Sequence, residues 1–140
     1  MRTKRMMALA AAAITAATLF HTPAAQAADT GPHTAAPAAD GRLYAYYDVD
    51  FKRLCASWSG NSTNWGSCRN TTSSLWNNGY PGNLDDVWVY WGLNHSGARR
   101  GVHNGVALAN LNHWTFDANT GAGAGQRLNN NISSHMWTNL

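Results

Sequence analysis

Short stretches in which hydrophobic and polar residues alternate recur along this chain from about residue 43 onward. In the clearest one, residues 87–91 read Val-Trp-Val-Tyr-Trp, so the two valines share one face of an extended segment with Trp91. Alternation with a period of two predicts a β-strand. The same reasoning predicts strands at 43–47, 54–58, 74–76 and 134–137. Residues 77–83, which are rich in Asn, Gly and Pro, predict a turn-dense bridge between two groups of strands.

These strands and turns form one pattern that occurs twice. The first copy opens at residues 46–51 and closes at 70–76, and the second opens at 90–97 and closes at 129–137. Each copy opens with an aromatic strand and a tight polar turn, and each closes with an Asn-x-x-Ser-Ser run that leads into an aromatic strand. A duplicated set of short strands predicts an all-β sandwich of two Greek key motifs.

The composition agrees with an all-β fold. The chain contains no Glu, Lys52 is its only Lys after residue 27, and all seven Trp lie between residues 58 and 137. Helices favour Ala, Leu, Glu, Lys and Arg, whereas aromatic residues favour strands and Asn, Gly and Ser favour turns. The composition therefore disfavours long helices in this part of the chain.

The N-terminal residues predict a secreted protein. Three basic residues near the start precede an apolar stretch at 6–20 and an Ala-Gln-Ala sequence at 25–27, which is the arrangement of a cleaved signal peptide. We expect residues 1–27 to be this signal peptide, 28–40 to be a flexible leader and 41–140 to be one folded domain. The apolar stretch is shorter than the roughly 20 residues that span a bilayer.

The charge of the mature chain argues against a nucleic-acid partner. Three of the ten basic residues and none of the seven acidic residues precede residue 28, so basic and acidic residues balance in the rest. Nucleic-acid binding relies on a basic surface. We therefore expect no nucleic-acid partner. We also expect no membrane partner, because no segment after residue 27 looks transmembrane, and we expect a monomeric domain.

Cys55 and Cys68 are the only cysteines. In an oxidising compartment, two cysteines at this separation most simply form one disulfide, and the alternative is a free reactive thiol. By the chain-entropy model, closing a loop of this length contributes about 3 kcal/mol.

The opening of each copy resembles the βγ-crystallin Greek key motif, which is an aromatic residue, four residues, an aromatic residue, one residue and a glycine. Tyr90, His95 and Gly97 match it with His in the second aromatic position, and Tyr46 and Phe51 match its aromatic positions. Arg53 stands where the motif has Gly, at a position where the folded hairpin needs a positive φ. The resemblance implies a βγ-crystallin-like sandwich.

The closing runs resemble the calcium-binding sequence of that family. Residues 129–134 match it fully, and residues 69–74 match it except for Arg69. The resemblance implies oxygen ligands for Ca²⁺ from five residues, Asn70, Ser73, Asn129, Asn130 and Ser133. Neutral ligands make weak sites, because carboxylate charge raises the affinity for Ca²⁺. In the alternative interpretation, no cofactor is required and the serines at 73, 74, 133 and 134 hold the folded hairpins by side-chain hydrogen bonds.

A second resemblance covers roughly residues 41–139. Residues 73–97, with Trp-Asn-Asn-Gly-Tyr at 76–80 and Asp-Asp-Val-Trp-Val-Tyr at 85–90, are similar to the secreted bacterial metalloproteinase inhibitors of the Streptomyces type. This resemblance implies a secreted inhibitor whose partner is a secreted metalloprotease. Members of that family are expected to have two disulfides, whereas this chain can form only one.

Two segments are candidates for contact with a partner. One is the loop between Cys55 and Cys68, where Trp58 and Trp65 are candidate contacts. The other is an insertion in the second copy, because Tyr46 to Ser73 spans 27 positions whereas Tyr90 to Ser133 spans 43. The extra residues fall within 103–125, where His103 and His113 are candidate contacts. Alternatively, the insertion is a hairpin in which residues 106–108 pair with 114–116.

Catalytic patterns are missing from the sequence. It contains no Gly-x-Ser-x-Gly and no His-Glu-x-x-His, and the adjacent residues Asp85 and Asp86 would point to opposite faces of a strand. We therefore predict that the protein is not an enzyme. Together with the predicted secretion, the resemblance to the metalloproteinase inhibitors implies a peptidase inhibitor that blocks the active-site cleft with a rigid loop. The alternative is a calcium-stabilised, carbohydrate-binding or cell-surface-binding module without inhibitory activity, in which Trp58 and Trp65 would be exposed.

Overall fold

The computed structural model describes residues 37–140. The predicted signal peptide, residues 1–27, and most of the predicted leader lie outside the described residues. Residues 38–40 already contact the domain, since Asn78 Nδ2 donates to the carbonyl oxygen of Ala38 at 3.2 Å. Within residues 37–140, no helix is long and apolar enough to cross a membrane.

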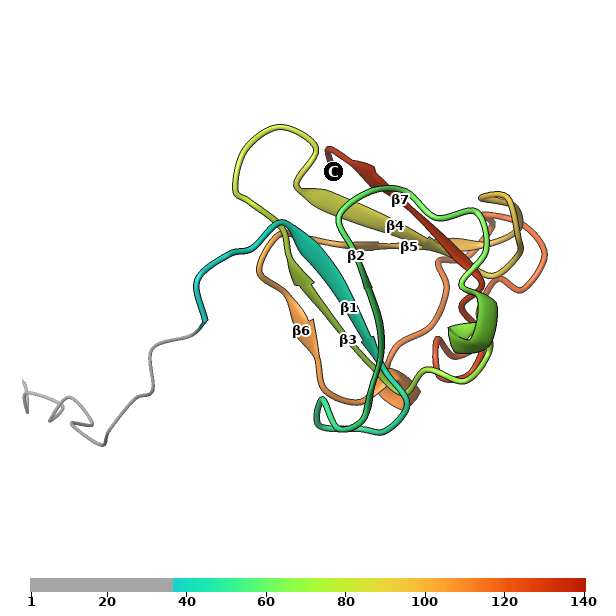
Figure 1. The fold of residues 1–140 in the computed structure, drawn as a ribbon. Helices are drawn as coiled ribbons and strands as arrows, with labels where there is room; N and C mark the ends of the chain where they lie inside the picture. Colours follow the sequence, from blue (N-terminus) through green and yellow to red (C-terminus); the bar gives the residue numbers. More distant parts are fainter. Residues whose placement is uncertain (1–36) are drawn as a thin grey trace, which may run out of the picture. The chain divides into compact units, whose positions relative to one another are not determined.

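Two antiparallel sheets form the domain (Figure 1). The first sheet has the order β2-β1-β3-β6 and consists of β1 (Arg42–Tyr46), β2 (Leu54–Trp58), β3 (Ser74–Asn78) and β6 (Ala107–Leu108). The second has the order β5-β4-β7 and consists of β4 (Asp86–Tyr90), β5 (Arg99–Val102) and β7 (Ser134–Thr138). Two short 3₁₀ helices, η1 (Gly66–Cys68) and η2 (Leu111–His113), lie in the connections.

The two copies of the sequence pattern exchange one segment each. β6 belongs to the second copy but pairs with β3 of the first, with Leu75 opposite Leu108. In the first copy, the loop that follows β2 pairs with β7 of the second copy at a single bridge between Ser62 and His135. In each copy, the segment that crosses to the sheet of the other copy gives the Greek key arrangement. The predicted sandwich of two Greek key motifs is therefore confirmed.

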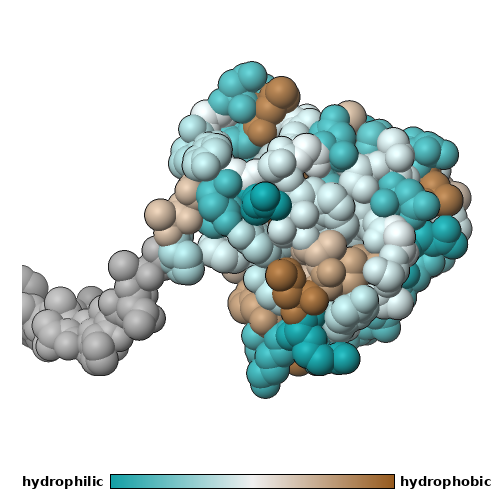
Figure 2. All heavy atoms as spheres, viewed as in Figure 1, coloured by the Kyte–Doolittle hydropathy of each residue, from teal (hydrophilic) through white to brown (hydrophobic). Residues whose placement is uncertain are grey.

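The core lies between the sheets and follows the alternation seen in the sequence. Leu43, Ala45 and Leu75 face inward from the first sheet, and Val87 and Val89 face inward from the second, all fully buried. Their neighbours on the strands point outward, as a period of two requires. On the face seen in Figure 2, hydrophobic residues form small groups among hydrophilic ones.

One serine in each copy fastens a folded hairpin to the sheet. Ser74 Oγ donates to the carbonyl oxygen of Asp48 at 2.6 Å and accepts from the backbone N–H of Phe51 at 3.0 Å. Ser134 Oγ makes the equivalent bonds to Gly92, at 2.6 Å, and His95, at 3.1 Å. Of the four serines expected to hold the hairpins, the second of each pair does so.

The two hairpins turn through a left-handed residue at matching positions. Gly97 has a φ of +73° and Arg53 has a φ of +51°. A side chain at such a φ is strained, because Cβ approaches the following carbonyl oxygen. The Arg53 guanidinium also forms an ion pair with the Asp48 carboxylate of the same hairpin.

The hairpin that the sequence left open as an alternative for the insertion is not formed. Leu108 pairs with Leu75 of β3, and Thr115 forms a bridge with Arg127 instead of pairing with residues 106–108. Leu108 and Phe116 are both buried in the core. Leu108 and Phe116 therefore each fill a place in the core. Pairing residues 106–108 with 114–116 would draw these two side chains away from the core.

Candidate functional site

The loop between β2 and η1 is closed by the Cys55–Cys68 disulfide, as predicted. The two Cα atoms lie 5.8 Å apart, within the usual range for a disulfide. Cys68 is buried and belongs to the hydrophobic core, so the bridge anchors the end of the loop in the interior.

Hydrogen bonds hold this loop against β7 and the residue before it along much of the loop's length. Ser62 and His135 exchange two backbone hydrogen bonds, at 3.0 and 2.9 Å. The Trp65 N–H donates to the carbonyl oxygen of Ser133 at 2.9 Å, and the Trp137 N–H donates to Asn61 Oδ1 at 2.8 Å. The loop therefore lies along β7, an edge strand of the second sheet, and pairs with it at one bridge.

A buried aromatic cluster supports the loop from beneath. The Trp58 and Trp65 rings stack with centroids 4.7 Å apart, and Trp65 is only 3% exposed. Trp65 Nε1 donates to His135 Nδ1 at 2.8 Å, and His135 Nε2 lies 2.8 Å from the carbonyl oxygen of Gly60. Since Nδ1 accepts, the imidazole carries its proton on Nε2 and donates it to Gly60.

The electrostatic environment keeps this imidazole neutral. His135 is fully buried. Burial lowers the pKa of His135 to about 4, although the hydrogen bond to Gly60 opposes this shift and raises the pKa.

The expectation that Trp65 is exposed is wrong. Its indole fills the space between the loop and β7, and Trp58 is half-buried and packs against the core. The buried Trp65 ring therefore offers no free face on which a sugar would stack. The exposed residues of the loop are small and polar, and sequence reasoning did not single them out: Ser59, Gly60, Asn61, Thr63 and Asn64.

The two histidines proposed as partner contacts lie on other elements. His103 follows β5 and is exposed, with Nδ1 3.3 Å from Asp86 Oδ1. His113 is exposed in η2. Among the hydrogen bonds of residues 37–140, none joins either histidine to the disulfide-closed loop.

The closing runs of the two copies meet each other. The Asn70 N–H donates to the carbonyl oxygen of Ile132 and the Asn130 N–H to that of Thr72, both at 3.0 Å. Asn70 and Asn130 share a left-handed conformation, with φ of +58° and +59°. This pairing reproduces the duplication of the sequence as an approximate twofold arrangement.

One pair of predicted calcium ligands is brought together at this meeting point. Ser133 Oγ donates to Asn70 Oδ1 at 3.2 Å. Both side chains line a cavity of about 200 Å³, together with Arg69, Trp91, Gly92, Leu93 and Asn131. The oxygen donors of this lining are neutral and a guanidinium adjoins them, a donor set that fits Ca²⁺ poorly.

The remaining predicted ligands are not assembled in the same way. Asn129 Oδ1 is buried without a hydrogen-bond partner among the described residues. The hydrogen bonds of residues 37–140 include none between the Ser73 side chain and that of Asn129 or Asn130. The described residues also contain no group of three or more His, Cys, Asp or Glu side chains that could hold a metal.

Comparison with solved structures identifies the fold. One similar structure is a domain solved in work on the evolution of the eye lens βγ-crystallin domain fold, at a TM-score of 0.52 and 18% identity over 70% of this chain and 85% of that one. Another is a βγ-crystallin from Ciona intestinalis, at a TM-score of 0.51 and 13% identity over 70% of this chain and all of that one. No family model and no curated protein matches the sequence. The domain therefore has a βγ-crystallin-like fold, and at these identities the likeness shows the fold alone.

Proposed function

We propose that this protein is a secreted peptidase inhibitor that places residues 59–64 of the disulfide-closed loop in the active-site cleft of a peptidase, most simply a metallopeptidase. The observation that carries the proposal is the way this loop is held. An inhibitor must present a segment that stays ordered when free, since preorganisation lowers the ordering cost of binding.

The loop has that property at both ends and in its middle. Cys55 and Cys68 close it, the bridge between Ser62 and His135 fixes its centre, and Trp65 anchors it in the interior. A loop that is cut within residues 59–64 would still be held on both sides of the cut. Cys55 precedes this segment, the buried Trp65 and Cys68 follow it, and the disulfide joins the two sides.

The insertion of the second copy is a weaker candidate for the contact. Leu108, Leu111 and Phe116 of this segment are buried in the core, so much of the insertion serves packing. Secretion, which the sequence predicts from residues 1–27, would bring the domain to extracellular peptidases.

The test is an inhibition assay of the purified protein against a thermolysin-type metallopeptidase, with serine and cysteine peptidases in parallel. We expect inhibition at micromolar concentration. Thr63→Arg should weaken it at least tenfold, because Thr63 is exposed in the loop and a long charged side chain there would disturb the contact. Thr115→Arg, the same change at an exposed position of the insertion, is the matched control and should inhibit like the wild type.

Removing the bridge gives a second arm. Cys55→Ser with Cys68→Ser should turn an inhibitor into a substrate that is cut within the loop, which mass spectrometry of the reaction would detect. No inhibition of any of the three peptidase classes at micromolar excess would contradict the proposal. Equal loss of inhibition in Thr63→Arg and Thr115→Arg would exclude this loop as the contact.

A further inference from the structure

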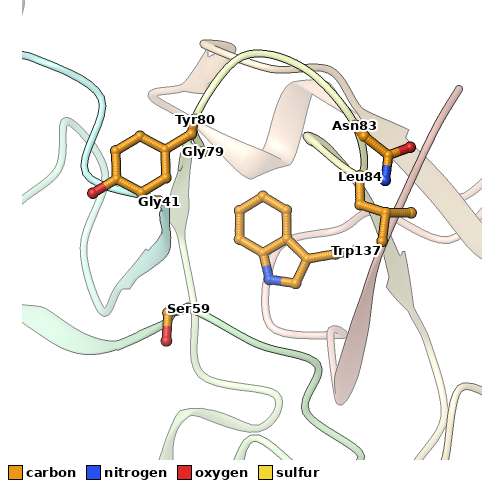
Figure 3. A pocket seen from close by; sticks show the side chains of 7 residues that line it. All are labelled: Gly41, Ser59, Gly79, Tyr80, Asn83, Leu84 and Trp137. Atoms are coloured by element: carbon orange, nitrogen blue, oxygen red, sulfur yellow. The ribbon is translucent and has the colours of Figure 1, made fainter.

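A second candidate site lies where the connection between the two copies passes the end of β7. A cavity of about 260 Å³ opens there (Figure 3). Its lining consists of Gly41, Ser59, Gly79, Tyr80, Asn83, Leu84 and Trp137.

Two aromatic rings of this lining rest on glycine backbones. A Cβ placed on Gly79 would lie 2.7 Å from Cζ3 of Trp137, and one placed on Gly41 would lie 2.6 Å from Cε2 of Tyr80. Such close approach is open only to glycine and fixes where each ring can lie. Figure 3 shows the Trp137 indole between the side chains of Tyr80 and Leu84.

Two large side chains of the lining are exposed to solvent. Tyr80 is 66% exposed and Leu84 is 52% exposed. Tyr80 and Leu84 do not belong to the hydrophobic core, so the packing of the sandwich does not account for these two side chains.

The polar groups of the cavity are all uncharged. Ser59 and Asn83 supply a hydroxyl and an amide, and no Asp, Glu, Lys or Arg belongs to the lining. The indole Nε1 of Trp137 is buried and has no hydrogen-bond partner among the described residues. Because this atom has no accessible surface, the indole contributes its carbon atoms to the cavity wall and not its N–H.

We propose that this cavity binds one ring of a neutral sugar, as a unit of a longer saccharide. A pyranose has an apolar C–H face that packs on aromatic rings and a rim of hydroxyls that pairs with neutral donors and acceptors. Phosphorylated or acidic ligands would need a cation in the lining, which is absent. The volume lies just below the roughly 300 Å³ at which sites for drug-sized ligands begin, which suits a single ring.

This site differs from the one that the sequence suggested for a saccharide. Trp65 is buried and Trp58 is half-buried against the core, whereas the site proposed here is lined by Trp137 and by the exposed ring of Tyr80. The two proposed sites share Ser59, but the variants that test them, Thr63→Arg and Tyr80→Ala, each lie in one site only, so the two proposals can fail separately.

The experiment is an NMR titration of the ¹⁵N-labelled protein with β-1,4-linked oligomers of glucose and of N-acetylglucosamine. We expect one or both to shift, saturably, the resonances of Tyr80 and Gly79 and the indole N–H of Trp137. Tyr80→Ala should weaken binding at least tenfold, while Tyr80→Phe, which keeps the ring, should retain it. Trp114→Ala, which removes an exposed aromatic ring elsewhere, should bind like the wild type.

Three outcomes would overturn the inference. The first is no saturable shift with either oligomer. The second is binding that Tyr80→Ala leaves unchanged in a variant whose spectrum shows the native fold. The third is that a neutral tyrosine-containing peptide binds the cavity more tightly than both oligomers, which would make it a contact site for a protein.

Discussion

His135 links the protonation state of one side chain to the position of a whole loop. Its ring accepts from Trp65 and donates to Gly60, and its backbone pairs with Ser62. Protonation would place a second N–H against that of Trp65, so the contact would become repulsive. The loop should therefore be least stable in acid.

We predict that the free energy of unfolding decreases as the pH falls from about 6.5 to 4.5. The folded pKa of His135 is about 4 and the unfolded value is 6.5, so in this range the unfolded state binds more protons than the folded state. The contribution of His135 to the free energy of unfolding is fully present above about pH 6.5 and decreases by roughly 2–3 kcal/mol by about pH 4.5. Urea unfolding at both pH values measures it.

The control for this prediction is His135→Gln. It should be less stable than the wild type at about pH 7 and lose most of the pH dependence. The pKa values of Asp48 and Asp86 are also lowered, but these two carboxylates lose their contribution to folding stability only below about pH 4, outside the range measured here. An unchanged slope in the variant would assign the effect to other groups.

Arg53 is the second residue whose local geometry has a measurable consequence. We predict that Arg53→Gly raises the free energy of unfolding, by up to about 1 kcal/mol, because it relieves a left-handed conformation at the loss of one exposed ion pair. The reciprocal change, Gly97→Arg, should be destabilising, since a Cβ there would lie 2.9 Å from the carbonyl oxygen of Ala122. Thermal unfolding of both variants tests this, and a destabilised Arg53→Gly would show that the ion pair outweighs the strain.

Residue burial was the least predictable property of this chain. Trp58 and Trp65 were correctly placed beside the disulfide, but their exposure depends on β7, which is about 70 residues away in sequence. The small polar residues at 59–64 carry no pattern that marks them. Their importance follows from the contacts that hold the loop.

At the scale of elements, the folded hairpins depend on two serines. Ser74 is fully buried and satisfies two backbone groups of the first hairpin. We predict that Ser74→Ala lowers the free energy of unfolding by about 1–3 kcal/mol, because both groups lose their partner in a buried place. Ser73→Ala is the matched control and should change stability by less than about 0.5 kcal/mol. Equal effects of the two, measured by urea unfolding, would contradict this assignment.

Most strands could be predicted from the sequence, and the exceptions have physical reasons. The ends of the five predicted strands differ from the observed ends by at most two residues. β5, with the sequence Arg-Arg-Gly-Val, was missed because it has one apolar residue and no alternation. β6 was expected only in the alternative in which residues 106–108 pair with 114–116, and its actual partner is β3, because periodicity identifies a strand and not its neighbour.

At the scale of the whole molecule, the two copies meet at their closing runs. The cavity at Asn70 and Ser133 draws side chains from both copies. A ligand there would stabilise the pair of motifs rather than one of them. Arg69 is the residue that departs from the calcium-binding sequence at this place.

We predict that millimolar Ca²⁺ raises the melting temperature of the wild type by less than about 2 °C, because neutral ligands beside a guanidinium bind it weakly. Arg69→Asp supplies a carboxylate and removes the positive charge, so calorimetry should then detect binding. Arg42→Asp, which makes the same charge change on β1, should not gain it. A tight site in the wild type would show that backbone carbonyls suffice.

The sequence by itself determined the all-β class, the duplicated Greek keys and the pairing of Cys55 with Cys68, because these depend on local periodicity, turn chemistry and a simple count of cysteines. The tertiary structure decided which parts of the repeat reach the surface. It buried Trp65, ordered residues 59–64 against β7 and opened the cavity at Tyr80 and Trp137. These features join residues from opposite ends of the domain, and contacts at such separation are fixed by how the two sheets pack.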